Sequence, residues 1–275
     1  IKSLFCIGLL LTVATTVNAQ SVTWISSTEG NVWQKSKVKL QSKSEQNPVL
    51  QVDGTENGVV FKNWGTTFNE LCWDALGLTR TEQDEILYNI FSPQGDLRIT
   101  RGRISMGAND YARSWYSCDE VEGDFELRYF NINRDKQTII PFIRAAQKYN
   151  PNLTFWISPW CPPSWMKING DYPVLSSPFN SLSEKQNYLL YGATGGQVDE
   201  NEMKLTDARD GVFPRQLATT DFMIQDPRYL QTYADYFCRF IDAYKEQGIP
   251  IDMVMYQNEA YSYTPYPGCA WTAAG

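Results

Sequence analysis

One long amphipathic helix that leads directly into an apolar strand constrains the fold of this chain more than any other feature. Asp226 is a favourable N-cap, Pro227 takes the first helical position, and apolar side chains recur at helical spacing up to Tyr244 before Gly248. The apolar residues 251–256 then predict a buried strand. A helix of this length between strands is typical of the crossover unit of a parallel α/β fold.

The same alternation of strand and helix extends back to about residue 59. A helix is expected to start at the capping box Thr81–Asp84, and another to cover about 136–149 with Pro141 in its first turn. The expected strands of this region are residues 59–61, 97–101, 153–157 and 251–256. The long stretch 161–220, rich in Asn, Ser, Gly and Pro, is expected to be a loop that shapes a substrate cleft.

The first nineteen residues have the pattern of a secretory signal peptide. Lys2 precedes an apolar stretch from Leu4 to Val13, and Val17 and Ala19 stand where a signal peptidase selects small residues. This stretch is shorter than the roughly 20 apolar residues that span a membrane. We therefore expect residues 1–19 to be a signal peptide, and the protein to be secreted (extracellular, periplasmic or at the cell surface) without stable membrane insertion.

The mature chain divides into two regions by pattern. Residues 20–55 are expected to form part of a β-rich side domain, because short β-favouring segments alternate there with Ser, Asn, Gly and Pro. These segments are 22–25, 32–33, 38–40 and 49–52. Residues 56–275 have the β/α rhythm, and the lack of an initiating Met and of a closing helix leads us to expect a partial reading frame.

The amino-acid composition excludes several kinds of catalytic site and argues against some partners. The chain has no histidine, so Ser-His and Cys-His triads are excluded and carboxylates are the natural proton-transfer groups. The balance of 31 acidic against 24 basic residues argues against nucleic acid as a partner. Without CxxC spacing or histidine we expect no structural zinc and no cofactor, and the pairing of the cysteines stays open. The mature cysteines are Cys72, Cys118, Cys161, Cys238 and Cys269.

Asn258 and Glu259 place an amide and a carboxylate just after the strand predicted at 251–256. The carboxyl ends of parallel strands are where barrel folds carry their sites. On its own, Glu259 is more readily interpreted as a solvent-exposed loop carboxylate. The surrounding motifs decide whether Glu259 is a site carboxylate or an exposed loop residue.

Three motifs together resemble glycoside hydrolase family 30, the glucosylceramidase-like retaining β-glycosidases. They are residues 158–170 (SPWCPPSWMKING), residues 103–110 (RISMGAND) and residues 257–259 (QNE). The resemblance implies a (β/α)8 TIM barrel joined to a β-rich side domain, of which about the first four β/α units are present. It also implies two glutamates, an acid/base after strand four and a nucleophile on strand seven, expected beyond Gly275.

The resemblance also implies roles for single residues. Glu259 would be the acid/base, Asn258 would bind the sugar 2-hydroxyl, and Arg103 would lie near the catalytic carboxylates. Asp110 would accept hydrogen bonds from sugar hydroxyls, and Trp160 would form an apolar wall of the sugar site. Four aromatic residues past the acid would stack on sugar or pack the loop on itself. These are Tyr261, Tyr263, Tyr266 and Trp271.

Structural alternatives compete with several of these roles. Arg103 and Asp110 could form an ion pair at the barrel mouth, and Trp160 and Trp165 could be core aromatics. Two departures from the family pattern stand out. Ala260 replaces a proline after the Asn-Glu pair, and residues 64–70 give a bulkier turn after the first strand than the usual glycine-rich one.

We therefore predict a secreted retaining β-glycosidase that acts by double displacement on a β-linked glycan or glucoside, with β-1,6-glucan favoured over glucosylceramide. The 275 residues alone are expected to be inactive, because one of the two carboxylates is missing. A non-catalytic carbohydrate-binding protein on a degenerate barrel is the main alternative. An inverting hydrolase, with carboxyl groups about 6.5–9.5 Å apart, is a weaker one. The sequence makes no prediction of oligomeric state.

Overall fold

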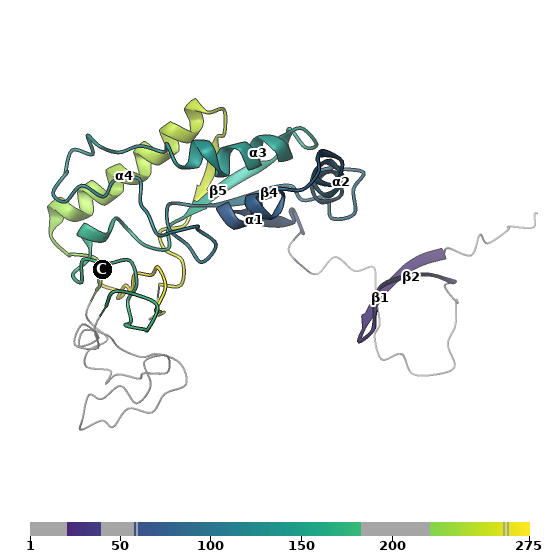
Figure 1. Ribbon diagram of the computed structural model, residues 1–275, viewed down its shortest axis with the longest axis horizontal. Coiled ribbons are helices and arrows are strands. Elements are labelled where there is room, and N and C mark those ends of the chain that lie inside the picture. The colour runs from purple at the N-terminus through teal and green to yellow at the C-terminus, as the bar shows by residue number, and fades with distance from the viewer. Residues whose placement is uncertain (1–20, 40–57, 59, 183–220, 261, 263) are drawn as a thin grey trace, which may run out of the picture. The chain divides into compact units, whose positions relative to one another are not determined.

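The computed structural model describes residues 21–39, 58, 60–182, 221–260, 262 and 264–275 (Figure 1). The chain divides into two compact units, Ile1–Val60 and Phe61–Gly275. The predicted signal peptide, the expected strand 49–52 and residues 183–220 of the predicted long loop lie outside the described residues.

The first unit contains an antiparallel hairpin of β1 (Ser21–Thr28) and β2 (Asn31–Lys39). The short strands expected at 22–25 and 32–33 are thus parts of these two longer ones, as are residues 38 and 39 of the strand expected at 38–40, whose last residue lies outside the described residues. Gly30 lies in the turn at φ 78°, a backbone conformation that glycine adopts without strain. A two-stranded hairpin is marginal without a packing partner, because it buries little apolar surface.

The second unit is built on a parallel sheet in the order β3, β4, β5, β6. The parallel α/β prediction is confirmed. The strands are β3 (Gly65–Phe68), β4 (Arg101–Ser105), β5 (Thr154–Ser158) and β6 (Ile251–Val254). β3 and β6 are the two edge strands of this sheet, so each keeps one side of its backbone without a strand partner among the described residues.

Two strand predictions were wrong in position. Val60 and Phe61 have no regular structure, and the first strand is Gly65–Phe68, inside the segment that was expected to be a turn. Phe68 explains the difference, because it is fully buried in the register opposite Ile104. The second strand lies at 101–105 instead of 97–101, since Arg98 at φ 52° interrupts the extended backbone before it.

The helices agree better with the sequence. In α4, Asp226 accepts a hydrogen bond from the backbone N–H of Arg228 at 2.8 Å, and Gly248 follows the helix at φ 72°. Pro141 lies in the first turn of α3, as predicted. The helices are α1 (Glu70–Ala75), α2 (Arg80–Phe91), α3 (Ile139–Gln147) and α4 (Pro227–Glu246), with short 3₁₀ turns at Asp135–Gln137 and Ser164–Met166.

The capping box of α2 was predicted two residues too late. Thr79 and Glu82 form it: the Glu82 N–H donates to Thr79 Oγ1 at 3.4 Å, and the Thr79 N–H donates to Glu82 Oε2 at 3.1 Å. Thr81 and Asp84 fit the same sequence pattern. Thr79 becomes the N-cap because its backbone is extended while the helix begins at Arg80.

One face of the sheet is buried beneath the helices. Phe68 packs against Phe142 of α3, with ring centroids 4.6 Å apart, and Phe155 lies next to it at 5.8 Å. Gly102 is required between them, since a Cβ there would lie 2.5 Å from the Phe68 ring. Arg103 follows Gly102 in β4, so its side chain is directed to the opposite face of the sheet. This alternation places the charged residue away from the helical layer.

Candidate active site

The ends of three neighbouring strands meet through one guanidinium group. Arg103 Nη2 donates to Asn258 Oδ1 at 2.7 Å and to Ser158 Oγ at 3.2 Å. Arg103 comes from β4, Ser158 ends β5, and Asn258 follows β6. Because parallel strands all end at the same edge of a sheet, residues far apart in sequence meet here.

Arg103 also lies over two aromatic rings. Its guanidinium carbon is 5.2 Å from the ring centroid of Trp156 and 5.8 Å from that of Trp160. Burial lowers the pKa of Arg103, while the negative charge of Glu259 acts in the opposite direction. Arginine stays protonated in proteins, so the group is a fixed cation beside the carboxylate.

The loops after β5 and β6 are joined by hydrogen bonds. The Asn258 N–H donates to the carbonyl of Pro159 at 2.8 Å. Gln257 Nε2 donates to the carbonyl of Trp160 at 2.7 Å, and Gln257 Oε1 accepts from Trp271 Nε1 at 3.3 Å. Sequence reasoning assigned no role to Gln257. Its position directly before Asn258 in the QNE motif was the available signal.

Glu259 is exposed at the end of this network, and its backbone has φ 47°, which is uncommon for a residue with a side chain. Its carbonyl accepts from the Ser262 N–H at 2.8 Å, which closes a tight turn. Its carboxylate accepts from the Tyr266 hydroxyl at 3.3 Å. Most of the acceptor capacity of the carboxylate is therefore open to solvent or a ligand.

Asp110 belongs to the same electrostatic neighbourhood. Partial burial raises the pKa of Asp110, and the charge of Glu259 raises it further. The ion pair between Arg103 and Asp110 that the sequence allowed is not among the salt bridges of the described residues. The Arg103 side chain donates hydrogen bonds to Asn258 and Ser158 instead.

The two tryptophans of the SPW motif have different environments. Trp160 is half-buried at the site, and its ring meets that of Tyr266 edge to face, with centroids 5.9 Å apart. Trp165 is a core residue: it packs edge to face on Phe125 at 5.5 Å and donates from Nε1 to the carbonyl of Asp119 at 3.1 Å. The core alternative thus applies to Trp165.

The four aromatic residues that follow the predicted acid in sequence do not share one environment. Tyr261 and Tyr263 lie outside the described residues. Trp271 is buried and stacks on Tyr233 of α4, with centroids 6.4 Å apart, so it packs the loop. Of the two described members of this group, Tyr266 contacts the predicted acid.

A second carboxylate lies just beyond the end of β3. Glu70 is 1% exposed and accepts from Arg134 Nε at 2.8 Å, from Arg134 Nη2 at 2.6 Å and from the Arg113 N–H at 2.8 Å. Burial raises the pKa of Glu70, but the hydrogen bonds from Arg134 and Arg113 outweigh it and hold the pKa below its ordinary value. Sequence reasoning placed Glu70 in a bulky turn. It instead begins α1.

In the described ranges, no cluster of three or more acidic, cysteine or histidine side chains is arranged to hold a metal ion. Cys118, Cys161 and Cys269 are buried free thiols, and Cys72 and Cys238 are exposed ones. Among the described helices, none has the length and apolar character needed to cross a membrane.

The fold and site together define a parallel α/β protein with an available carboxylate at the carboxyl edge of its sheet. Residues 61–177 match the glycosyl hydrolase family 30 TIM-barrel domain, which confirms the resemblance. The matched range contains Arg103, Asp110 and Trp160.

Curated relatives agree with this assignment. The chain is 28% identical over 90% of its length to putative glucosylceramidase 4 of Caenorhabditis elegans, and 27% identical over 74% to endo-1,6-beta-D-glucanase neg1 of Aspergillus fumigatus. It spans 40% of the first relative's length and 34% of the second's.

Solved structures support the fold. SrfJ from Salmonella typhimurium aligns with a TM-score of 0.58 at 17% identity, over 91% of this chain and 46% of that one. An endo-β-1,6-glucanase aligns with a TM-score of 0.53 at 24% identity, over 76% of this chain and 37% of that one. At these identities the likeness concerns the fold alone.

Proposed function

We propose that the protein is a secreted β-glycosidase that hydrolyses O-glycosyl bonds with retention of configuration. The observation that carries the proposal is the place of Glu259 at the carboxyl end of β6, next to an Asn258 side chain held by Arg103. An exposed carboxylate with free acceptor capacity can give a proton to a bound substrate and take one from water. The family 30 match of residues 61–177 supports glycosidic bonds as the target.

In the proposed mechanism Glu259 acts twice. In the first step it gives its proton to the glycosidic oxygen while a carboxylate nucleophile bonds to the anomeric carbon and the leaving group departs. In the second step the Glu259 carboxylate takes a proton from water, the water oxygen bonds to the anomeric carbon, and the nucleophile is released. Asn258 would hold the sugar 2-hydroxyl, Asp110 other hydroxyls, and Trp160 the apolar face of the ring.

The partner carboxylate completes the proposal. A retaining site needs two carboxyl groups about 5–5.5 Å apart. We place the nucleophile on the seventh strand of a (β/α)8 barrel of which residues 56–275 form the N-terminal half. No residue of the described chain is given this role, and Tyr261, expected near the sugar, lies outside the described residues.

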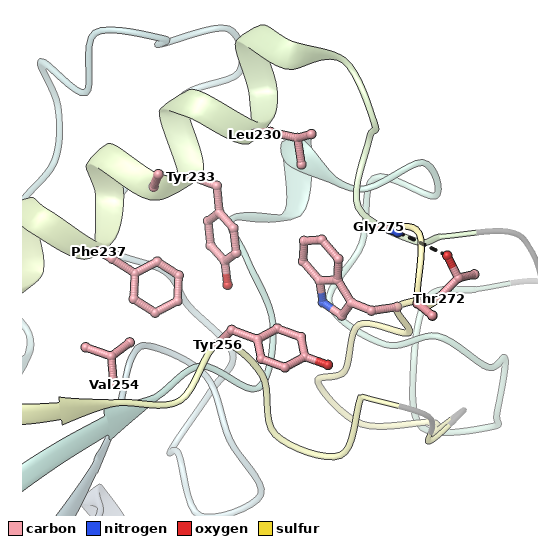
Figure 2. A pocket seen from close by; sticks show the side chains of 10 residues that line it. Leu230, Tyr233, Phe237, Val254, Tyr256, Thr272 and Gly275 are labelled. Atoms are coloured by element: carbon pink, nitrogen blue, oxygen red, sulfur yellow. Dashed lines mark hydrogen bonds between the residues drawn. The ribbon is translucent and has the colours of Figure 1, made fainter.

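An open apolar surface beside β6 supports the proposal of a complete barrel. A pocket of about 710 Å³ lies between α4 and the edge strand β6, lined by Leu230, Tyr233 and Phe237 on one side and Val254 and Tyr256 on the other (Figure 2). A further β/α unit alongside β6 would pair its free backbone and fill this pocket. We further propose that residues 20–55 contribute to a β-rich side domain and that residues 1–19 are a signal peptide.

The proposed substrate class is a β-linked glucan or glucoside. Similar proteins carry the names glucosylceramidase and endo-1,6-beta-D-glucanase. We favour β-1,6-glucan, because the edge-to-face pair of Trp160 and Tyr266 offers apolar surface suited to sugar rings at the acid. Turnover of a β-1,6-linked glucose disaccharide against glucosylceramide compares the two candidates directly.

The decisive experiment is chemical rescue in the full-length protein. Glu259→Ala should lose turnover of a β-1,6-linked disaccharide but still cleave a dinitrophenyl β-glucoside, whose leaving group needs no proton. Added azide should then accelerate that cleavage and yield the β-glycosyl azide, identified by NMR. Asp252→Ala is the control, because Asp252 lies on β6, the strand before Glu259, but forms a salt bridge with Arg101 at 2.7 Å. Azide should not accelerate its reaction.

The alternatives predict other outcomes. A carbohydrate-binding protein would show sugar affinity without turnover in the wild type. An inverting hydrolase would release the α-anomer first and form no β-glycosyl azide. Either result would remove Glu259 from the proposed role.

A further inference from the structure

We infer that Tyr266 is the positioning residue of Glu259: its hydroxyl orients the carboxyl group for proton transfer to the leaving group. The inference rests on the proposed function, since it assigns Tyr266 a part in that same site. The Tyr266 hydroxyl donates to Glu259 Oε2 at 3.3 Å. This distance is long for an O–H···O bond, as is common for catalytic contacts before substrate binds.

Glu259 needs such a partner because little else holds its side chain. It is exposed, and the contact from Tyr266 is its side-chain hydrogen bond among the described residues. The nearby cation, Arg103, donates to Asn258 and Ser158. An exposed glutamate explores several rotamers, and a proton donor displaced by about 1 Å loses much of its effect.

Tyr266 is itself held firmly. Its ring packs edge to face on Trp160, with centroids 5.9 Å apart, and its carbonyl accepts from Thr264 Oγ1 at 3.1 Å. The backbone just after it pairs with another loop, where the Gly268 N–H donates to the carbonyl of Tyr172 at 3.0 Å and Pro267 forms a bridge with Pro173. The hydroxyl therefore belongs to a well-packed residue and donates to an exposed carboxylate.

The charge state of Tyr266 suits the role. Burial, followed by the negative charges of Glu259 and Asp110, raises the pKa of Tyr266 to about 12. The phenol thus stays protonated and remains a donor at any pH at which the protein works. A protonated phenol can donate to Glu259 in both steps, because the carboxyl group can accept a hydrogen bond whether or not it carries the proton.

The test is Tyr266→Phe in the full-length protein, with Tyr129→Phe as the matched control. Tyr129 is 62% exposed in the loop that follows β4, and the same hydroxyl is removed there. For Tyr266→Phe we expect kcat/KM on a β-1,6-linked disaccharide to fall on the order of tenfold, mostly in kcat. On dinitrophenyl β-glucoside, which needs no acid, the change should stay below about twofold.

A second readout separates positioning from packing. If Tyr266 positions the carboxyl group, KM for the disaccharide should stay within about twofold of the wild-type value in Tyr266→Phe, as it should in Tyr129→Phe, and the loss should fall on kcat. An equal loss on both substrates, or a loss that falls on KM, overturns the inference and leaves Tyr266 as a packing residue. Glu259→Gln, assayed in parallel, tests the proposed function separately. Full turnover of the disaccharide by that variant overturns both, whereas a Glu259-dependent enzyme with an unaffected Tyr266→Phe overturns the inference alone.

Discussion

Two glutamates follow strands of the same parallel sheet, and their surroundings are opposite. Glu70, after β3, is 1% exposed and accepts two hydrogen bonds from Arg134 and one from the Arg113 backbone. Glu259, after β6, is exposed and accepts one long hydrogen bond from Tyr266. Both stand at the edge of the sheet where α/β proteins carry their sites.

The number of hydrogen-bond donors separates a structural carboxylate from one that can exchange protons with a substrate. A carboxylate whose lone pairs are already occupied by fixed donors has little capacity left for a substrate, and its negative charge stabilises the fold. A carboxylate with one weak donor keeps its capacity for proton exchange. Position at the end of a strand is therefore not enough to identify an acid/base, whereas the number of donors around each carboxylate distinguishes the two.

The largest expected effect concerns Glu259. Glu259→Gln should lower kcat on a β-1,6-linked disaccharide by about 10²–10⁴-fold, because the amide neither donates nor takes the proton. The melting temperature should stay at the wild-type value, since the side chain is exposed and loses one weak contact. Steady-state kinetics and thermal unfolding measure the two quantities. A variant that unfolds earlier would place Glu259 with Glu70 among structural carboxylates.

Glu70→Gln should show the reverse pattern. It leaves the Arg134 guanidinium without its anionic partner, and we expect the free energy of unfolding to fall by about 2–3 kcal/mol. Urea unfolding measures this loss. Glu126→Gln is the control, because Glu126 pairs with Arg128 on the surface and its removal should leave the midpoint unchanged. If Glu70→Gln removes activity at unchanged stability, the comparison fails.

Asp135 is a third carboxylate, and its hydrogen-bond donors are tyrosine hydroxyls instead of an arginine. Asp135 is fully buried and accepts from the hydroxyls of Tyr244 at 2.6 Å and Tyr116 at 2.7 Å. Burial raises the pKa of Asp135 to about 6, against the opposing effect of these hydroxyls. Since the folded state holds this proton more tightly than the unfolded state, the stabilisation is present below about pH 4 and is lost as pH rises through about 6.

Asp135→Asn should remove that pH dependence. In the wild type we expect the contribution of this group to the free energy of unfolding to decline by about 2 kcal/mol between pH 4 and pH 7. Urea titrations at intervals of pH measure the slope in both proteins. Asp119, whose pKa is also raised to about 6, mainly by burial, should keep its own part of the slope in the variant. An unchanged slope in Asp135→Asn would contradict the assignment.

The smallest expected effects come from the two arginines. Arg103→Lys keeps the charge but loses the planar group that binds Asn258 and Ser158, so kcat/KM should fall about tenfold at nearly constant stability. Arg134→Lys should reduce the free energy of unfolding by about 1 kcal/mol at nearly constant kcat/KM. Both variants should be assayed for kcat/KM and for the free energy of unfolding. If both lose the same quantity, the distinction between the two glutamates is contradicted.

Much of the fold was predictable because local chemistry determines it. The N-cap Asp226, the Pro227 start and the Gly248 end of α4 lie where the pattern indicated, since capping depends on neighbouring residues alone. The strand at 154–158 was placed within one residue. The errors at β3 and β4 arose where local patterns compete: Val60 and Phe61 favour strand but stay outside the sheet, while Phe68 gains a buried place within it.

The candidate site was predictable only in part. Arg103 and Asn258 were named from motifs, and their hydrogen bond shows that these segments meet. The roles of Gln257 and Glu70 were missed, because nothing in their local sequence tells which carbonyl or guanidinium will lie opposite. The distinction between Trp160 at the site and Trp165 in the core likewise depended on which neighbours the fold supplied.

The sequence by itself determined the parallel α/β class, the limits of its longest helix, the absence of histidine and the motifs that carry the family resemblance. These properties depend on composition and on residues close together in the chain. The tertiary structure alone decided which glutamate is saturated and which is free, because hydrogen bonds from Arg134 to Glu70 and from Arg103 to Asn258 join residues 64 and 155 positions apart. Such contacts follow from packing, which local patterns do not encode.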